Sequence, residues 1–412
     1  MQLLVRPDPF PDESLESYLL RLAEANFIES YGLLSGAVRD WLWQHNHDAA
    51  GAFPLELSRV NIYHANQSSG LRVRALKLVE TLTDIDRLPL LKLALLHSAS
   101  RFCNGHNAVF RNGVDIPRCF IRREGVPVCP SCLEESPYIR QHWHWSAYQA
   151  CTAHGCELLH RCPACDKSLD YLRHELLSKC SCGLDLAEAS VSPASEDKLQ
   201  LSRLVTGDVF DSRNPLLQTQ SLSVRNGVLL WHFLHTGSAK AGDIELDSSG
   251  LASAIGYFED WPASLMQELE AAASNADQKL LKDFNKTAFQ HIFGDILLAS
   301  RWLPVSDLSK NFVMATVMEF LSSLVDSHPK SKRANVADLL LTVPEAAAVL
   351  STTHEQVYRL YQEGYLELAF KPQLHQKLAA YKPAFYLRQV VELLQTRMQS
   401  DAGMANVYLP VR

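Results

Sequence analysis

The residues best suited to carry chemistry in this 412-residue chain are its ten cysteines. All of them lie between Cys103 and Cys182, and most stand in short pairs: two C-x-x-C pairs, one C-x-x-H pair and one C-x-C pair. A two-residue spacer lets a tight turn bring both ligand atoms to about 2.3 Å from one metal ion, and two such pairs complete a tetrahedron. The spacing therefore predicts structural zinc, whereas disulfide frameworks are typical of secreted proteins.

Taking the pairs in chain order predicts two zinc sites. The ligands of the first are Cys129, Cys132, Cys151 and His154, and those of the second are Cys162, Cys165, Cys180 and Cys182. The last pair is one residue short of the usual spacing, but Gly183 follows it and supplies the conformational freedom that the turn needs. An alternative for the first site is Cys156 in place of His154, with looser spacing.

The three remaining cysteines, Cys103, Cys119 and Cys156, are expected to be buried apolar thiols. Both zinc sites have four protein ligands, whereas a catalytic zinc keeps one position open. The sequence also lacks the metalloprotease pattern H-E-x-x-H, the deaminase pattern H-x-E and the Gly-Lys pair of a phosphate-binding loop. A nuclease would need clustered acids, and nothing in the sequence brings Glu134–Glu135 near Asp243, Glu245 and Asp247. We therefore expect structural metal and no enzymatic activity.

The charge balance limits the nucleic-acid functions that the chain can have. A formal net charge of −7 argues against nonspecific coating of nucleic acid, because such binding scales with the number of cations presented. One basic stretch, residues 101–123, offers possible phosphate contacts at Arg111, Arg118, Arg122 and Arg123. The alternative is that this stretch is a solvated loop. No signal peptide or membrane span is expected, since the longest apolar run, Leu88–Leu96, is short and interrupted. These features predict a soluble, intracellular protein, which is a cytoplasmic localisation.

The hydrophobic periodicity predicts a mainly α protein with small β zinc ribbons. We expect a helical domain resembling a helix-turn-helix over residues 1–125, tandem zinc ribbons over 126–190, a helical domain over 195–330 and a C-terminal helix-turn-helix segment over 335–412. The first helix should bury one face made of Leu15, Tyr18, Leu19 and Leu22.

Several aromatic residues are expected to build the core. Trp231, Trp261 and Trp302 are predicted core anchors. Trp41 and Trp43 are also expected in the core, although an interface role is the alternative. His142 and His144 flank Trp143 and are expected to alternate along a strand that packs on the zinc ribbon, not to bind metal.

The C-terminal segment has the pattern of a helix-turn-helix. Thr342 and Glu345 predict a capping box at the start of one short helix, and a second helix should end at Gly364. The second helix offers Arg359 alone against Glu355 and Glu363, whereas a helix that binds the DNA groove normally presents several cations or amides. The shape indicates a DNA-binding element, but the charges indicate a weak one.

Taken together, these motifs resemble the TniQ family, the target-selection proteins of Tn7-like transposons. The similar residues are Ser14-Leu-Glu-Ser-Tyr18 with Leu22-Ala23, Cys129-Pro-Ser-Cys-Leu-Glu-Glu, the two following metal pairs, Phe258-x-x-Trp261-Pro262 and Arg301-Trp-Leu-Pro304. The opening phrase Arg6-Pro-x-Pro-Phe-Pro-Asp-Glu-Ser-Leu-Glu-Ser looks most like TniQ proteins of CRISPR-associated transposons with a type I-F effector.

That resemblance implies an adaptor without catalysis. It implies a homodimer bound to the Cascade effector with its crRNA, which links the recognised DNA to the AAA+ ATPase of the transposon and so to the transposase. Contact with target DNA would then be indirect or weak, because guide pairing reads the sequence. The alternative is a protein similar to TnsD, which would bind an attachment site by itself.

Overall fold

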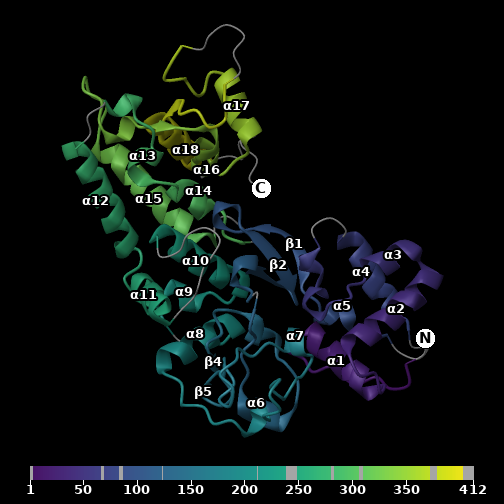
Figure 1. Cartoon of the computed structure of the whole chain (residues 1–412). Coiled ribbons are helices and arrows are strands. Elements are labelled where there is room, and N and C mark those ends of the chain that lie inside the picture. Colours follow the sequence, from purple (N-terminus) through teal and green to yellow (C-terminus); the bar gives the residue numbers. More distant parts are fainter. Residues whose placement is uncertain are drawn as a thin grey trace. The chain divides into compact units, whose positions relative to one another are not determined.

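The computed structural model describes residues 3–65, 69–82, 87–122, 124–210, 212–237, 248–279, 283–305, 310–371 and 378–401. The chain forms two compact units (Figure 1). Unit 1 comprises Met1–Phe102 and His106–Ile255, and unit 2 comprises Cys103–Gly105 and Gly256–Arg412. As predicted, the protein is mainly helical with small antiparallel sheets. The division into four segments stays a prediction.

Unit 1 begins with a group of short helices. They are α1 (Leu15–Ala25), α2 (Tyr31–His45), α3 (His47–Ala52), α4 (Ser69–Val79), α5 (Leu90–Leu93) and the 3-10 turn η2 (Ile62–His64). The predicted apolar face of α1 is confirmed, since Leu15, Tyr18, Leu19 and Leu22 are each at most 1% exposed. Ser14 caps this helix, because its hydroxyl accepts a hydrogen bond from the Ser17 N–H at 3.1 Å.

Helix α1 also buries a carboxylate. Glu16 is 3% exposed and accepts a hydrogen bond from the Asn61 amide, while its second oxygen has no partner among the described residues. Burial raises the pKa of Glu16 from 4.5 to about 7, because the charged form loses its hydration. Between pH 4.5 and about 7, Glu16 is therefore protonated in the folded protein and ionised in the unfolded chain.

This proton makes stability depend on pH in a predictable direction. Because the folded pKa lies above the unfolded one, Glu16 costs no stability below pH 4.5, and the free energy of unfolding falls as pH rises from 4.5 to about 7. The full cost above that window is roughly 3 kcal/mol. We expect Glu16→Gln to flatten this dependence and to stabilise the protein at pH 8, as measured by urea unfolding across pH. The exposed Glu24 on the same helix gives the control, Glu24→Gln, and equal slopes for all three proteins would contradict the prediction.

The arginine-rich stretch forms a sheet, so its alternative interpretation as a loop is wrong. Strands β1 (Leu96–Arg101), β2 (Asn107–Arg111) and β3 (Val114–Pro117) pair antiparallel in that order. Apolar residues such as Val109 and Ile116, paired in register, supply the buried face. Helix α10 (Leu222–His235) packs against β3, where the Asp115 N–H donates to the Ser223 hydroxyl at 2.9 Å.

The second half of unit 1 contains the cysteine clusters. Its elements are η4 (Arg118–Phe120), α6 (Pro130–Glu135), η5 (Gln141–His144), β4 (Ala150–Cys151), β5 (Cys156–Glu157), α7 (Tyr171–His174), η6 (Leu186–Glu188), α8 (Glu196–Thr206) and α9 (Pro215–Gln218). Trp231 of α10 is fully buried, as expected for a core anchor. Trp43 of α2 is 58% exposed, so the expectation of a core position is wrong for it, and Trp41 of the same helix is half-buried.

Unit 2 is a helical bundle around α15 (Phe312–Ser327), which packs against α12 (Ala263–Lys279), α14 (Ile296–Arg301) and α18 (Leu387–Asp401). Unit 2 also contains α13 (Gln290–Phe293), η7 (Phe284–Lys286), η9 (Val336–Asp338) and the ribbon of β6 (Leu340–Leu341) with β7 (Phe385–Tyr386). Helix α11 (Ser248–Glu259) spans the boundary between the units. Trp302 is 46% exposed and Trp261 is half-buried, so neither is the fully buried core anchor that we expected.

The two helices predicted near the C-terminus are present as α16 (Val343–Val349) and α17 (His354–Gln362), and they pack against each other. The capping box is confirmed: the Thr342 N–H donates to Glu345 at 2.7 Å and the Glu345 N–H donates to the Thr342 hydroxyl at 3.4 Å. Gly364 follows α17 with φ +82°, a conformation that glycine adopts readily. A helix-turn-helix that binds DNA stays a prediction. Within the described residues, no helix combines the length and the apolar character that crossing a membrane requires.

Candidate metal centres

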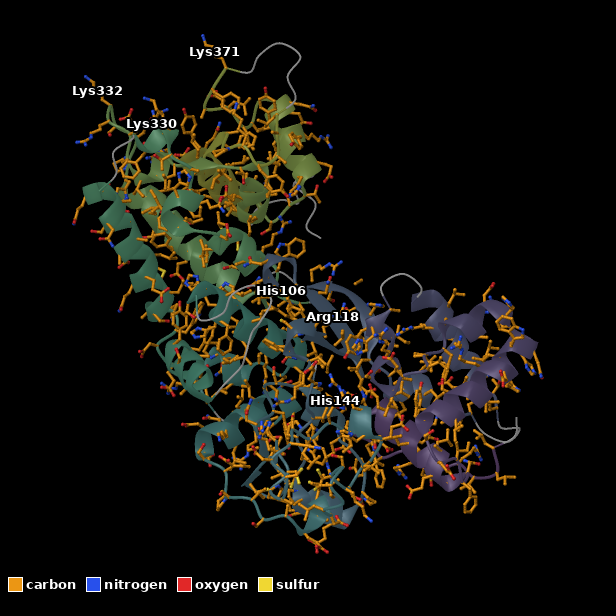
Figure 2. All side chains as sticks on the ribbon, in the orientation of Figure 1. His106, Arg118, His144, Lys330, Lys332 and Lys371 are labelled. Atoms are coloured by element: carbon orange, nitrogen blue, oxygen red, sulfur yellow. The ribbon has the colours of Figure 1, made fainter. Side chains whose placement is uncertain are left out.

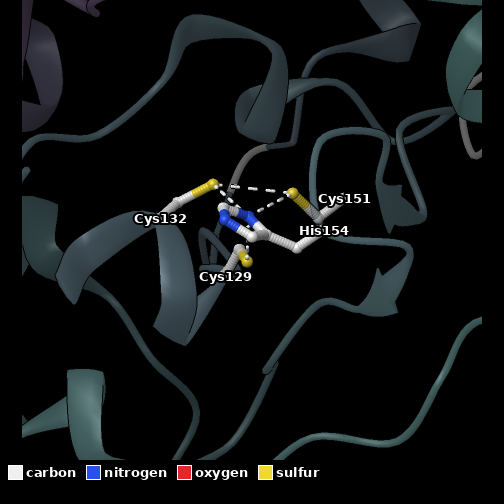
Figure 3. A group of neighbouring side chains, drawn as sticks. All are labelled: Cys129, Cys132, Cys151 and His154. Atoms are coloured by element: carbon white, nitrogen blue, oxygen red, sulfur yellow. Dashed lines mark hydrogen bonds between the residues drawn. The ribbon is translucent and has the colours of Figure 1, made fainter. Parts of the chain in front are cut away.

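The first predicted ligand set converges in unit 1. The sulfurs of Cys129, Cys132 and Cys151 and one imidazole nitrogen of His154 all lie within 4.8 Å of one another. Figure 3 shows the four side chains pointing toward a common centre. The Nδ1 atom of His154 lies 3.3 Å from the Cys132 sulfur and 3.5 Å from the Cys151 sulfur. The sulfurs of Cys132 and Cys151 are 3.5 Å apart.

These separations match the edges of a metal tetrahedron. Ligand atoms that each lie about 2.0–2.3 Å from one zinc ion at tetrahedral angles are roughly 3.4–3.8 Å from one another. All three cysteines are buried, so the sulfurs have little access to water. Hydrogen bonds from Cys132 and Cys151 lower the pKa of the Cys129 thiol, which favours the thiolate that binds metal. The geometry of this cluster therefore fits zinc.

Local backbone conformation explains how each pair turns its ligands inward. Cys129 stands directly before α6, whose first residue is Pro130, so one helical turn brings Cys132 back over Cys129. The other pair of this cluster, Cys151 and His154, lies at the turn of the β4–β5 hairpin. There Gly155 has φ +64°, and its N–H donates to the Cys151 carbonyl at 2.8 Å.

Glu135 is not a ligand of the first cluster but forms a hydrogen bond with one of its ligands, His154. The Nε2 atom of His154 lies 3.0 Å from a Glu135 oxygen, so the imidazole donates its proton there and its Nδ1 lone pair faces the sulfurs. Such a carboxylate fixes the tautomer of a metal-binding histidine. Sequence reasoning considered Glu135 only as a nuclease acid. Its position three residues after Cys132, one turn further along the same short helix, was the available clue.

The second ligand set also converges. The sulfurs of Cys162, Cys165, Cys180 and Cys182 lie within 4.8 Å of one another, with separations of 3.6 Å for Cys162–Cys182 and 3.7 Å for Cys165–Cys180. Each pair is followed by a residue with positive φ, Asp166 at +55° and Gly183 at +95°. The predicted role of Gly183 is thereby confirmed. Cys182 is exposed, so this cluster lies at the surface of unit 1, whereas the first is enclosed.

Cys156 lies beside the first cluster and outside its ligand set. Its sulfur is 3.6 Å from that of Cys129, but the four atoms that converge include His154 in its place. Of the other two cysteines, Cys103 is buried as expected and Cys119 is half-buried. Both clusters can thus satisfy a zinc ion with four protein ligands, which is the arrangement of structural sites.

The segment that contains the first cluster is similar to a known protein family. Residues 4–158 match the TniQ family model. The TniQ match contains α1, all four ligands of the first cluster and Glu135, and it ends before Cys162. No curated protein matches the chain. Over these residues the chain is similar to the TniQ family, as its motifs indicated, and the type I-F subgroup stays a prediction.

The arginines predicted to contact nucleic acid differ in their exposure to solvent. Arg111 is buried at 6% exposure, and its guanidinium donates to the Gln141 side chain and the Glu13 carbonyl, both at 2.6 Å. The prediction of a phosphate contact at Arg111 is therefore wrong, because the alternation of β2 turns this side chain inward. Arg118 is exposed and Arg122 half-buried. Arg123 lies outside the described residues.

Two histidines near the first cluster are structural, although not in the way we expected. Residues 141–144 form the 3-10 turn η5, so the predicted strand alternation of His142 and His144 is wrong. His144, labelled in Figure 2, is 4% exposed and its Nε2 atom lies 2.8 Å from the Tyr171 hydroxyl. Burial lowers the pKa of His144 to about 3, so the ring is neutral at physiological pH.

Proposed function

We propose that this protein is a non-catalytic adaptor for RNA-guided DNA transposition. In this proposal a homodimer binds the crRNA-loaded Cascade effector of a type I-F system in the bacterial cytoplasm. The adaptor links the target DNA to the AAA+ ATPase of the transposon and thereby to the transposase. The observation that carries the proposal is the TniQ match over residues 4–158.

The metal clusters support a structural and not a catalytic role. Each offers four ligands that are mutually at tetrahedral spacing, which would leave no coordination position for water or substrate. Zinc in such a site supplies folding energy by joining segments that have little other core between them. In the first cluster, the ion would join α6 to the β4–β5 hairpin.

The charges on α17 support delegation of sequence recognition to a guide. Arg359 is the helix's only Arg or Lys, and its guanidinium lies 2.7 Å from Glu363 of the same segment. A cation paired with a neighbouring carboxylate contributes little to the counterion release that drives DNA binding. We therefore expect weak binding of bare duplex DNA.

Co-purification with the guide-loaded Cascade complex tests the proposal. The tagged full-length chain should retain the complex at two copies per effector, and an RNA-free preparation should lose it. Binding of random duplex DNA, measured over a salt series, should stay weak. Arg359→Gln should leave retention unchanged, because the proposal gives α17 no role in reading DNA.

The second candidate is an attachment-site reader similar to TnsD, and the capped, packed pair α16–α17 favours it. It predicts the opposite results: no retention by Cascade, tight salt-dependent binding of one chromosomal duplex, and loss of that binding in Arg359→Gln. Those results would overturn the adaptor proposal.

A further inference from the structure

A basic pocket lies in unit 1, and none of its lining residues is a ligand in either metal cluster. Its volume is about 440 Å³, and its lining includes Tyr63, His64, His106, Asn107, Arg118 and Arg122. These residues come from η2, from the segment that begins β2 and from η4 with the residues after it. Figure 2 labels His106 and Arg118 on this part of the molecule. We call this cavity the arginine pocket.

The charge of the arginine pocket contrasts with that of the chain. Two arginines and two histidines line it, and none of its described lining residues is acidic, although the chain carries a formal net charge of −7. Arg118 is exposed, its guanidinium lies 5.5 Å from the centre of the Tyr63 ring, and no carboxylate of the described residues pairs with it. An unpaired guanidinium at the mouth of a cavity attracts an anion.

Arg122 adds a second, more enclosed cation. Its Nη2 atom donates to the Tyr148 carbonyl at 3.2 Å, and its Nε–H is buried without a partner in the described structure. Burial and the nearby Arg118, Arg72 and Arg59 lower the pKa of His64 to about 4. His64 is therefore neutral near pH 7, and its ring can donate one hydrogen bond to a ligand and accept another from it.

The pocket also has the components that bind a nucleobase. The ring of the half-buried His64 lies with its centroid 3.9 Å from that of the buried Tyr63, and the amide of the exposed Asn107 can bond the edge of a base. Bases of single strands stack on aromatic rings and on guanidinium planes. A volume of about 440 Å³ falls in the range of small-molecule sites and suits one nucleotide. A base within a duplex stays stacked and cannot enter such a cavity.

We propose that the arginine pocket binds one unpaired nucleotide of a single-stranded nucleic acid, with its phosphate on Arg118 and Arg122 and its base against the ring of His64, which packs on the buried Tyr63. The shared chemistry is that of a nucleoside monophosphate unit, which RNA and DNA both supply. This inference stands on the lining of the pocket and does not depend on the proposed adaptor function. An isolated protein that fails to bind Cascade can still bind the single strand.

The test uses the zinc-loaded full-length protein and fluorescence anisotropy of a labelled twelve-nucleotide strand, as RNA, as DNA and as the DNA duplex. We expect single strands to bind at least tenfold more tightly than the duplex at equal salt. Arg118→Glu should weaken single-strand binding at least tenfold and reduce the slope of log affinity against log salt by about 0.7, the value for one phosphate of a single strand. The matched control is Arg101→Glu, an exposed arginine of the same basic stretch that does not line the pocket.

Cys119 provides a second readout that does not depend on affinity. This half-buried thiol lines the arginine pocket, so a bound strand should slow its reaction with a maleimide, and Cys119→Ser gives the background from the other cysteines. Preference for the RNA strand over the DNA strand would assign a contact to the 2′-hydroxyl, and equal binding would assign recognition to phosphate and base alone. Either result supports the binding of a nucleotide in the arginine pocket. Unchanged binding by Arg118→Glu, equal binding of the duplex, or no protection of Cys119 would overturn it.

Discussion

Replacing Cys129 with serine is expected to leave about one zinc ion per chain and to unfold the segment similar to TniQ, residues 4–158. Cys129 is fully buried, and its sulfur lies 3.6 Å from the Nδ1 atom of His154. A serine hydroxyl stays protonated at neutral pH and is a poor zinc ligand. Structural zinc contributes about 10–16 kcal/mol of binding free energy to folding in small domains, which exceeds the net stability of most domains. Metal analysis and circular dichroism of the purified variant measure both effects.

Two further variants separate metal binding from the presence of a cysteine. Cys119→Ser alters a half-buried thiol outside both clusters and should keep all of the zinc. Glu135→Gln keeps the ligands but weakens the acceptor that orients His154, so we expect a zinc affinity about 10–100-fold lower in a folded protein. A Cys129→Ser protein that is folded, lacks zinc in the first cluster and still supports transposition would show that this metal is dispensable.

The metal ligands were predictable because their information is local. A pair such as Cys162 and Cys165 needs only a tight turn, and the residue after it, Asp166 at φ +55°, belongs to the same turn. The choice of partners then follows from chain order, since hairpins bring consecutive pairs together. The apolar face of α1 and the capping box at Thr342 were predictable for the same reason, because helical periodicity and caps act within a few residues.

Features that depend on distant segments were not predictable. Arg111 belongs to a basic stretch, but in the fold its guanidinium donates to Gln141 and to the Glu13 carbonyl, 30 and 98 residues away in the chain. The sequence around Arg111 does not identify these partners. The arginine pocket combines Arg118 with Tyr63 and His64, more than fifty residues away in the chain, so only the fold brings its parts together. A run of arginines therefore did not identify which of them a ligand can reach.

A buried arginine in unit 1 gives the second large expected effect. Arg225 of α10 is 1% exposed, and its guanidinium donates to four backbone carbonyls. The acceptors and distances are Thr219 at 2.7 Å, Asp208 at 2.8 Å, Leu204 at 3.0 Å and Leu217 at 3.2 Å. These carbonyls lie at the ends of α8 and α9, where the last carbonyls of a helix lack intrahelical donors. One side chain thus closes two helix ends onto a third helix.

We expect Arg225→Met to lower the free energy of unfolding by about 3–5 kcal/mol, because methionine fills similar volume but leaves buried carbonyls without a donor. Urea unfolding should show a lower midpoint at an unchanged m value. Arg225→Lys, which keeps the charge without the planar fork, should lose less. The control Arg203→Met removes an exposed ion pair with Glu196 on α8 and should cost less than about 1 kcal/mol.

The same substitution should reach the first metal cluster through α8. The Ser202 hydroxyl of α8 accepts hydrogen bonds from the Gln149 and Ala150 N–H groups at 3.0 and 2.9 Å, and this contact positions the strand that carries Cys151. Loosening α8 therefore weakens the hold on one zinc ligand, and Arg225→Met should release zinc to a chelator faster than the wild-type protein. Saturating zinc should then restore part of the lost free energy of unfolding, because a ligand that binds only the folded state stabilises that state. Unchanged zinc release alongside a lowered midpoint would show that α8 supports the fold without supporting the metal cluster.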